Sequence, residues 1–257
     1  MSAADAALSV SGVSVRFGGV TAVDDVSLSV LPGDIVGLIG PNGAGKTTLL
    51  NAISRLVPMA TGRVSVFGSD TTRAPAWRLP RVGVARTFQV VQPFGNLSIR
   101  ENVAIAAMFS MDALSRDDAL ERADQALQRT GLFAKRGHLP GEVTLADRKR
   151  LELSRALAMA PRLLLLDEVM AGLNHAEIDS MIRLVRGIRE EGTAVVVVEH
   201  VMKAIVAVCD RIVVLQNGRK IADGSPREVL EDPAVVAAYL GHRFAARHAQ
   251  SAQGAPA

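Results

Sequence analysis

The sequence predicts an α/β fold in which a buried sheet of parallel strands carries an antiparallel β segment and a helical segment. Short apolar runs at residues 163–166 and 194–198 flank a helix-like stretch at 175–191, an order typical of a parallel sheet covered on both faces. Residues 8–17 instead alternate apolar with small or polar positions, which indicates a half-buried antiparallel strand. Residues 95–160 contain several helix-start signals and are expected to be mostly helical.

The N-terminal third is expected to contain further short elements around one tight loop. In chain order these are a strand at 26–30, a strand at 35–39, a helix at 46–53 and a strand at 63–67. The apolar strand at 35–39 runs directly into a glycine-rich segment, so strand, loop and helix follow one another without a linker. A loop-like stretch with Pro75 and Pro80 comes next.

Capping signals mark the predicted helices of the middle and C-terminal regions. Ser98 and Ser115 are each followed three residues later by a carboxylate, and Gly131 is expected to end a helix. Near the end, the turn around Gly218 predicts a hairpin between 212–215 and 220–222. The next segment, Ser225-Pro226-Arg227-Glu228, predicts a helix start, and residues 242–257 are expected to be a flexible tail.

Composition excludes several classes of protein. Of the 257 residues, 49% are hydrophobic and 21% charged, so the chain is globular rather than disordered. Its longest apolar runs fall far short of the roughly 20 residues that span a bilayer, and residues 1–7 lack the pattern of a signal peptide. A net charge of +3 does not predict nucleic-acid binding, and the single cysteine, Cys209, excludes an internal disulfide and is expected to be a small buried apolar residue. We therefore expect the protein to stay in the cytoplasm.

The most specific motif is a phosphate-binding loop between the strand at 35–39 and the helix at 46–53. It matches G-x-x-x-x-G-K-[ST] and is followed by a second threonine, as Gly40-Pro41-Asn42-Gly43-Ala44-Gly45-Lys46-Thr47-Thr48. Its glycines let backbone N–H groups converge on phosphate oxygens at the positive end of the helix dipole. Lys46 is expected to reach the β- and γ-phosphates, and the Thr47 hydroxyl to ligate Mg²⁺.

Two adjacent carboxylates end the apolar strand at 163–166. Asp167 and Glu168 lie where the strands of open α/β sheets present their ligand-binding edge. We expect Asp167 to hold the coordination shell of Mg²⁺, and Glu168 to polarise an attacking water as a general base.

With these motifs the chain resembles an ATP-binding-cassette (ABC) ATPase over about residues 8–241. The resemblance implies a P-loop NTPase cassette with a mixed RecA-like core sheet and an antiparallel β subdomain, at about 8–94 and 161–241, and a helical subdomain at about 95–160. It also implies that Gln89 senses Mg²⁺ and the water, that His200 contacts the γ-phosphate, and that Phe17 stacks on adenine. Core packing is the alternative for Phe17.

The chain departs from the usual Leu-Ser-Gly-Gly-Gln signature of the family. Residues 143–147 occupy that position and read Val143-Thr144-Leu145-Ala146-Asp147. The resemblance implies that Thr144 and Ala146 face the nucleotide of a second cassette, because two cassettes close around two ATP molecules. Ala146 replaces a glycine and Asp147 replaces a neutral amide, so a non-hydrolysing, ATP-gated interaction module is the alternative to an active ATPase.

The family resemblance implies ATP and Mg²⁺ as cofactors and a membrane transporter as the working assembly. Partners would be membrane-spanning permease subunits, a second cassette in a homo- or heterodimer and, indirectly, a periplasmic or extracellular solute-binding protein, with this chain peripheral on the cytoplasmic face of the cell membrane. Several segments look most like ATPases that import branched-chain amino acids, or related amides and urea, namely 83–89, 150–152, 171–174, 199–200 and 238–241. A lipopolysaccharide-export type ATPase is the alternative. The basic run Arg148-Lys149-Arg150 is expected to be a solvated helix face.

Overall fold

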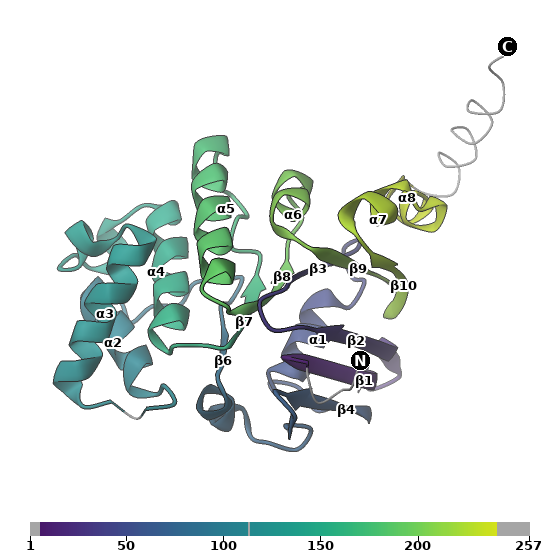
Figure 1. The fold of residues 1–257 in the computed structure, drawn as a ribbon, viewed down its shortest axis with the longest axis horizontal. Helices are drawn as coiled ribbons and strands as arrows, with labels where there is room; N and C mark the ends of the chain where they lie inside the picture. The colour runs from purple at the N-terminus through teal and green to yellow at the C-terminus, as the bar shows by residue number, and fades with distance from the viewer. Residues whose placement is uncertain (1–5, 113, 241–257) are drawn as a thin grey trace, which may run out of the picture.

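The structure is a computed structural model that describes residues 6–112 and 114–240. It contains a six-stranded sheet, a four-stranded sheet and helices that pack against both (Figure 1). The tail expected at 242–257 lies outside the described residues.

The six-stranded sheet is mixed, as the family resemblance implied. Its order is β10-β9-β3-β8-β7-β6, and every neighbouring pair is parallel except the antiparallel pair β9 and β10. The strands are β3 (Ile35–Ile39), β6 (Val84–Arg86), β7 (Leu163–Asp167), β8 (Ala194–Val198), β9 (Arg211–Gln216) and β10 (Arg219–Gly224). The antiparallel pair is the hairpin expected around Gly218.

β3, β7 and β8 are buried along their whole length, which shows that both faces of this sheet are covered. Side chains of a strand alternate between faces, so one strand feeds two hydrophobic cores. Leu164 and Leu166 pack into a core with the helices between residues 99 and 208. Leu163 and Leu165 pack into a second core with the helix after the phosphate loop and the smaller sheet. The carboxyl end of β7 is thereby held between two packed layers.

The smaller sheet is antiparallel and has the order β2-β1-β4-β5. Its strands are β1 (Leu8–Phe17), β2 (Val20–Val30), β4 (Thr61–Val66) and β5 (Ser69–Asp70). The strand expected at 26–30 is longer than predicted, because its N-terminal half pairs with the end of β1 across the tight turn at Gly18 and Gly19.

Three helices from the middle of the chain pack on one another at one side of the molecule (Figure 1). They are α2 (Ile99–Met108), α3 (Arg116–Thr130) and α4 (Leu145–Ala158), and the 3₁₀ turns η2 (Phe133–Lys135) and η3 (Pro140–Glu142) lie between α3 and α4. The predicted caps are confirmed: the Ser98 and Ser115 hydroxyls accept hydrogen bonds from the backbone N–H three residues on, and Gly131 ends α3 in the left-handed conformation.

The remaining helices border the large sheet. They are α1 (Lys46–Ile53), the 3₁₀ helix η1 (Ala76–Val82), α5 (His175–Glu190), α6 (Met202–Val208), α7 (Pro226–Glu231) and α8 (Pro233–Leu240). No local pattern predicts α6, whose cap residue Val201 offers no side-chain acceptor, or the three-residue strand β6. A 3₁₀ helix occupies the stretch that was expected to be a loop around Pro80.

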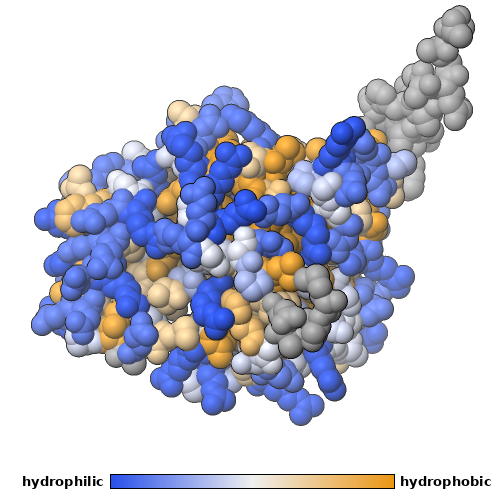
Figure 2. Space-filling model, in the orientation of Figure 1, coloured by the Kyte–Doolittle hydropathy of each residue, from blue (hydrophilic) through white to orange (hydrophobic). Residues whose placement is uncertain are grey.

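The burial of the cysteine agrees with the expectation from composition. No helix in the described part of the chain is long and apolar enough to cross a bilayer. The face in Figure 2 is largely hydrophilic, with apolar residues in scattered patches between the charged ones. Cys209 is 7% exposed, and burial raises the pKa of its thiol to about 12, so it is a buried apolar residue as predicted.

Candidate functional site

The phosphate loop turns sharply between β3 and α1, and two of its glycines cannot be replaced without a clash. Gly40 and Gly45 have φ of 150° and 98°, in the region that favours glycine. A Cβ on Gly40 would lie 2.1 Å from the Leu215 carbonyl oxygen, and one on Gly45 would lie 2.4 Å from the Ala22 carbonyl oxygen. The loop is therefore pressed against its neighbours, and its backbone leads directly into the N-terminus of α1, where free N–H groups favour an anion.

Lys46 is buried at the first position of α1, where its ammonium folds back over the loop. Its Nζ donates hydrogen bonds to the carbonyl oxygens of Gly40, at 2.8 Å, and Pro41, at 3.0 Å. Burial lowers the pKa of Lys46, and the charges of Glu168 and Asp167 oppose that shift. The cation that the motif predicts for phosphate is thus held within the loop.

One hollow of about 750 Å³ joins this loop to the acidic end of the large sheet. Such a volume lies within the range of ligand sites, about 300–1,000 Å³. Its lining contains most of the residues predicted to bind nucleotide or to act on it, namely Asn42, Gly43, Ala44, Gly45, Lys46, Thr47, Thr48, Gln89, Glu168 and His200, together with Ala22. Segments far apart in the sequence therefore meet at one place.

The two oxygens of the Glu168 carboxylate are held by two other predicted side chains, those of Gln89 and His200. Gln89 Nε2 donates to Glu168 Oε2 at 2.6 Å, and His200 Nε2 lies 2.6 Å from Glu168 Oε1. Glu168 itself is 8% exposed and has a φ of 51°, uncommon for a residue with a side chain, and its N–H donates to the Val198 carbonyl oxygen at 2.9 Å. A carboxylate fixed in this way beside a phosphate loop can orient and deprotonate a water.

Asp167 forms a buried ion pair that no local pattern predicts. Arg86 Nη2 lies 2.8 Å from Asp167 Oδ2, and Arg86 Nη1 donates to the Ser54 hydroxyl at 2.6 Å. Burial raises the pKa of Asp167, and the hydrogen bond and charge of Arg86 oppose the rise. The second oxygen, Oδ1, is buried and has no hydrogen-bond partner among the residues that the structure describes, which leaves an acceptor for a cation.

The residues near Asp167 fit Mg²⁺ by the chemistry of their donors. Thr47, Gln89 and Asp167 line one further hollow next to the loop and offer hydroxyl, amide and carboxylate oxygens, which Mg²⁺ prefers. Within the described residues there is no cluster of three His, Cys, Asp or Glu side chains that could hold a metal alone. A magnesium ion at this position would depend on phosphate and water oxygens for the rest of its shell.

The expectation that Arg148, Lys149 and Arg150 form a solvated face is wrong for Lys149. This residue is only 5% exposed, and its Nζ donates to the carbonyl oxygens of Gln89, at 3.1 Å, and Glu168, at 2.9 Å. The basic run lies in the first half of α4, and a helix turns about 100° per residue, so one of three consecutive residues points inward. The helical period could have indicated an inward residue, but not its partners.

Glu199 is a further buried acid near Glu168, and the sequence motifs assign it no role. It is 2% exposed, and its Oε1 accepts a hydrogen bond of 2.7 Å from the Met170 N–H. Burial raises the pKa of Glu199 to about 7, and the charge of Glu168 adds to the rise. Through this hydrogen bond to Met170, Glu199 holds the backbone two residues after Glu168.

Four predicted residues are not in the lining of the hollow at the loop, namely Phe17, Thr144, Ala146 and Asp167, and of these Asp167 lines the adjoining hollow with Thr47 and Gln89. Phe17 is 49% exposed at the end of β1, so the alternative that it packs in the core is wrong. Thr144 is the N-cap of α4, and its hydroxyl donates to Asp147 Oδ2 at 2.9 Å. Asp147 is paired with Lys135 Nζ at 2.6 Å, so the anion that departs from the family pattern has a cation beside it.

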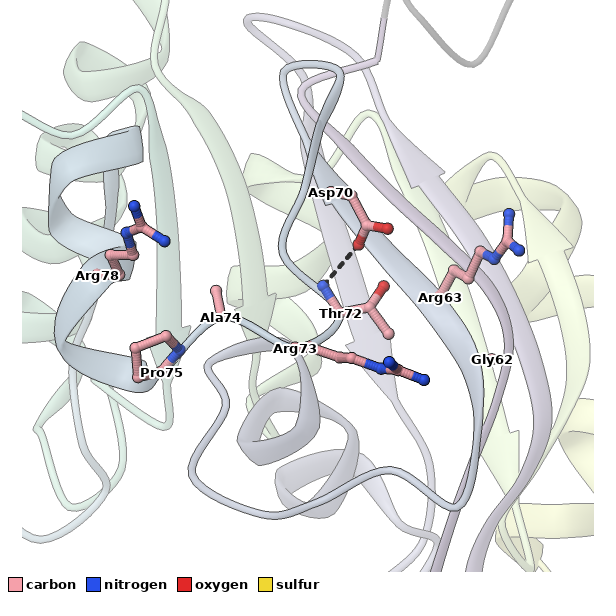
Figure 3. Close-up of a pocket in the computed structure, with 8 residues that line it drawn as sticks. All are labelled: Gly62, Arg63, Asp70, Thr72, Arg73, Ala74, Pro75 and Arg78. Atoms are coloured by element: carbon pink, nitrogen blue, oxygen red, sulfur yellow. Dashed lines mark hydrogen bonds between the residues drawn. The ribbon is translucent and has the colours of Figure 1, made fainter.

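Another hollow lies at the edge of the antiparallel sheet (Figure 3) and shares no lining residue with the hollow at the phosphate loop. It is lined in part by the exposed Arg63, Arg73 and Arg78, and its one acid, Asp70, accepts a hydrogen bond of 2.8 Å from the Thr72 N–H. It includes none of the residues predicted to bind nucleotide, so the phosphate loop marks the site and this hollow does not.

Two family models match the sequence and agree with the geometry of the site. The model described as "ABC transporter" matches residues 23–171, which include the phosphate loop, Gln89, Asp167 and Glu168. The chain belongs to the ABC transporter family. A second model, described as "Branched-chain amino acid ATP-binding cassette transporter", matches residues 219–245. The chain is accordingly an ATP-binding, ATP-hydrolysing cassette of the ABC type, as the sequence resemblance implied.

Similar proteins of this ABC family match nearly full length. The high-affinity branched-chain amino acid transport ATP-binding protein LivG of Escherichia coli (strain K12) is 35% identical over 248 residues, which cover 91% of this chain and 97% of that protein. The lipopolysaccharide export system ATP-binding protein LptB of the same strain is 33% identical over 239 residues, covering 93% and 99%. The ADP conformation of MJ1267, an ATP-binding cassette of an ABC transporter, has a TM-score of 0.83 at 29% identity and covers 92% of this chain and 99% of that chain.

Proposed function

We propose that this cassette hydrolyses ATP at the hollow beside the phosphate loop, with Glu168 as the general base. The observation that carries the proposal is the pair of 2.6 Å contacts by which Gln89 and His200 hold the two Glu168 oxygens next to Lys46 and Thr47. Phosphoryl transfer needs little covalent help from the protein, so positioning and charge stabilisation do most of the catalysis. Glu168 would take the proton of the attacking water, and His200 would contact the γ-phosphate.

The other loop residues would bind the phosphates and the metal. Backbone N–H groups from Asn42 to Thr48 would face phosphate oxygens, and the Lys46 ammonium would exchange its loop carbonyls for the β- and γ-phosphates. Mg²⁺ would be held by Thr47, Gln89 and the unpartnered Oδ1 of Asp167, and would neutralise charge between the phosphates.

The remaining predicted contacts require ligands and partners at the exposed rim. Phe17 is exposed on the β1 and β2 hairpin, which also contributes Ala22 to the hollow, and this supports adenine stacking by Phe17. Thr144 and Ala146 would face the nucleotide of a second cassette, in a homodimer or heterodimer. We take the cassette to span residues 8–241, with residues 95–160 as its helical subdomain.

We further propose that the cassette powers import of branched-chain amino acids or related amides. LivG carries that substrate class in its name, and the family model that matches residues 219–245 carries it in its description. In this assembly the chain would lie on the cytoplasmic face of the membrane, bound to permease subunits, and a periplasmic or extracellular binding protein would deliver the solute to them. The solute would be chosen by the permease and the binding protein, because this chain would not touch it.

Uptake by cells that lack and then regain this chain tests the proposal. Cells without it should lose ATP-dependent uptake of labelled leucine, and the wild-type chain should restore it. The Lys46→Ala variant should fail to restore uptake, while Lys220→Ala, which removes an exposed lysine paired with Asp223 on β10, serves as the matched control. Normal leucine uptake together with a defect in lipopolysaccharide export would instead favour the function named for LptB.

A further inference from the structure

Lys149 connects the helical part of the chain to both loops that carry the proposed catalytic side chains. It lies one turn into α4, and its Nζ donates to the Gln89 and Glu168 carbonyl oxygens at 3.1 and 2.9 Å. These are the same two residues whose side chains meet at 2.6 Å. One ammonium therefore holds the main chain of two residues that are joined again through their side chains.

The position of this ammonium is costly unless its partners are well placed. Lys149 is 5% exposed and, among the residues the structure describes, has no carboxylate within ion-pair distance. A buried cation must be compensated by hydrogen bonds and by the field of nearby charges. The two carbonyl dipoles supply the hydrogen bonds. Burial raises the pKa of Glu152, Asp167 and Glu199, and the positive charge of Lys149 is close enough to oppose that rise in each. Movement of either loop would remove one of the two hydrogen bonds of the ammonium.

The backbone of Glu168 provides a reason for such a tether. A φ of 51° is strained for a residue with a side chain, and such a conformation persists only where its surroundings fix it. The Glu168 N–H donates to the Val198 carbonyl oxygen, and the Glu168 carbonyl oxygen accepts from Lys149 Nζ at 2.9 Å and, over a longer 3.3 Å, from the Ala171 N–H. The direction in which the carboxylate points therefore depends on these bonds.

We propose that Lys149 is a positioning residue for ATP hydrolysis, through which α4 sets the Gln89 and Glu168 loops at the distance that lets their side chains meet. This inference rests on the catalytic roles proposed above for Gln89 and Glu168. Thr144 is the N-cap of the same helix, and Lys149 lies one turn further along it. If a second cassette displaced the N-terminus of α4, Lys149 would therefore move with it and shift the Gln89 and Glu168 loops of its own chain. Lys149 is not in the lining of the hollow proposed to hold the nucleotide, and in this proposal it acts on turnover rather than on binding.

Turnover and binding of the Lys149→Met variant separate this role from general stability. Methionine approximates the length of the side chain and removes the ammonium. We expect kcat for MgATP to fall about a hundredfold, the effect of a displacement of about 1 Å at a reacting centre, while the Kd for MgATP stays within about threefold of wild type. Lys149→Gln keeps an N–H donor, so its kcat should lie between those of the wild type and Lys149→Met. It replaces the methionine variant if that protein does not fold.

Arg148→Met is the matched control, because Arg148 is the adjacent cation and its Nε donates at 3.0 Å to the Pro140 carbonyl oxygen, outside the site. It should keep wild-type kcat. Hydrogen exchange provides a readout without turnover: residues 88–90 and 168–170 should exchange faster in Lys149→Met, and the amides of α4 should not change. Wild-type kcat in folded Lys149→Met or Lys149→Gln, or an equal loss in Arg148→Met, would overturn the proposal. Faster exchange at both loops, combined with wild-type hydrolysis by Glu168→Gln, would keep Lys149 as a tether but remove the catalytic role of Glu168.

Discussion

Gln89 and Glu168 are 79 residues apart in the sequence, yet Gln89 Nε2 donates to Glu168 Oε2 at 2.6 Å. The contact joins the loop after β6 to the carboxyl end of β7, two strands that lie side by side in parallel. It fixes one oxygen of the proposed base, while His200 contacts the other.

Replacement of Gln89 by alanine should therefore affect turnover more than nucleotide binding. We expect kcat to fall about ten- to a hundredfold, because the carboxylate loses one of its two positioning contacts, while the Kd for ATP changes by less than about threefold. Steady-state hydrolysis and equilibrium binding measure the two values. Gln125→Ala, which changes an exposed glutamine on α3, is the control and should resemble wild type. Equal losses in kcat and affinity would show that Gln89 acts mainly in binding.

Removal of one partner of the buried pair of Arg86 and Asp167 should lower the free energy of unfolding strongly. Arg86→Met would leave the Asp167 carboxylate buried without its cation, and breaking such a pair costs about 3–5 kcal/mol in the free energy of unfolding. Urea unfolding at neutral pH measures the loss. Arg227→Met breaks the exposed pair with Glu231 and should change the same free energy by less than about 1 kcal/mol. Similar values for the two variants would contradict the importance of the buried pair.

Glu199 should make stability depend on pH. Its pKa is raised to about 7 in the folded protein from the ordinary 4.5, so the folded state binds this proton more tightly. The stabilising effect is fully present below about pH 4.5 and is lost as the pH rises through about 7. Relative to Glu199→Gln, which does not titrate, the wild type should lose up to about 3 kcal/mol over this range. Parallel unfolding free energies of the two proteins between about pH 5 and pH 8 would contradict the raised pKa.

The proposed magnesium site predicts a specific defect in Thr47→Val. The variant keeps the branched shape and loses the hydroxyl oxygen, so the Mg²⁺ concentration that half-activates hydrolysis should rise about tenfold. A titration of activity with Mg²⁺ at saturating ATP measures it. Thr61→Val, which changes an exposed threonine at the start of β4, is the control and should keep the wild-type requirement for Mg²⁺. An unchanged requirement for Mg²⁺ in Thr47→Val would remove this hydroxyl from the coordination shell.

Much of the fold follows from local patterns in the sequence, because the relevant signals act over a few residues. The run 35–39 is β3 to the residue, the phosphate-loop helix spans Lys46–Ile53 as expected, and the Ser98 and Ser115 caps start α2 and α3. The elements without a signal are short: β6 has three residues and is held by pairing with β7, and α6 begins without a capping side chain. Such elements are stabilised by tertiary contacts rather than by their own sequence.

The site could be predicted where a motif fixes both residue type and spacing, and not where pairing is long-range. The phosphate loop, Gln89, Glu168 and His200 are all predicted from the sequence, and they line one hollow. The partners Arg86, Lys149 and Glu199 were missed in these roles, because each acts through a contact across the fold: Arg86 on Asp167, Lys149 on two carbonyls, and Glu199 on the Met170 N–H. Lys149 in particular belongs to a charged run whose usual place is the surface.

The assignment of Glu168 as the general base is tested most directly by single-turnover hydrolysis of labelled ATP with Mg²⁺ by the Glu168→Gln variant. The variant should bind ATP as tightly as the wild type and retain it uncleaved, with hydrolysis slowed about a hundredfold or more, as expected for the loss of a general base. Glu190→Gln, which changes an exposed glutamate at the end of α5, should cleave ATP at the wild-type rate. Release of ADP and phosphate by Glu168→Gln at the wild-type rate would contradict the assignment, and with it the catalytic significance of the contacts that Glu168 makes with Gln89 and His200.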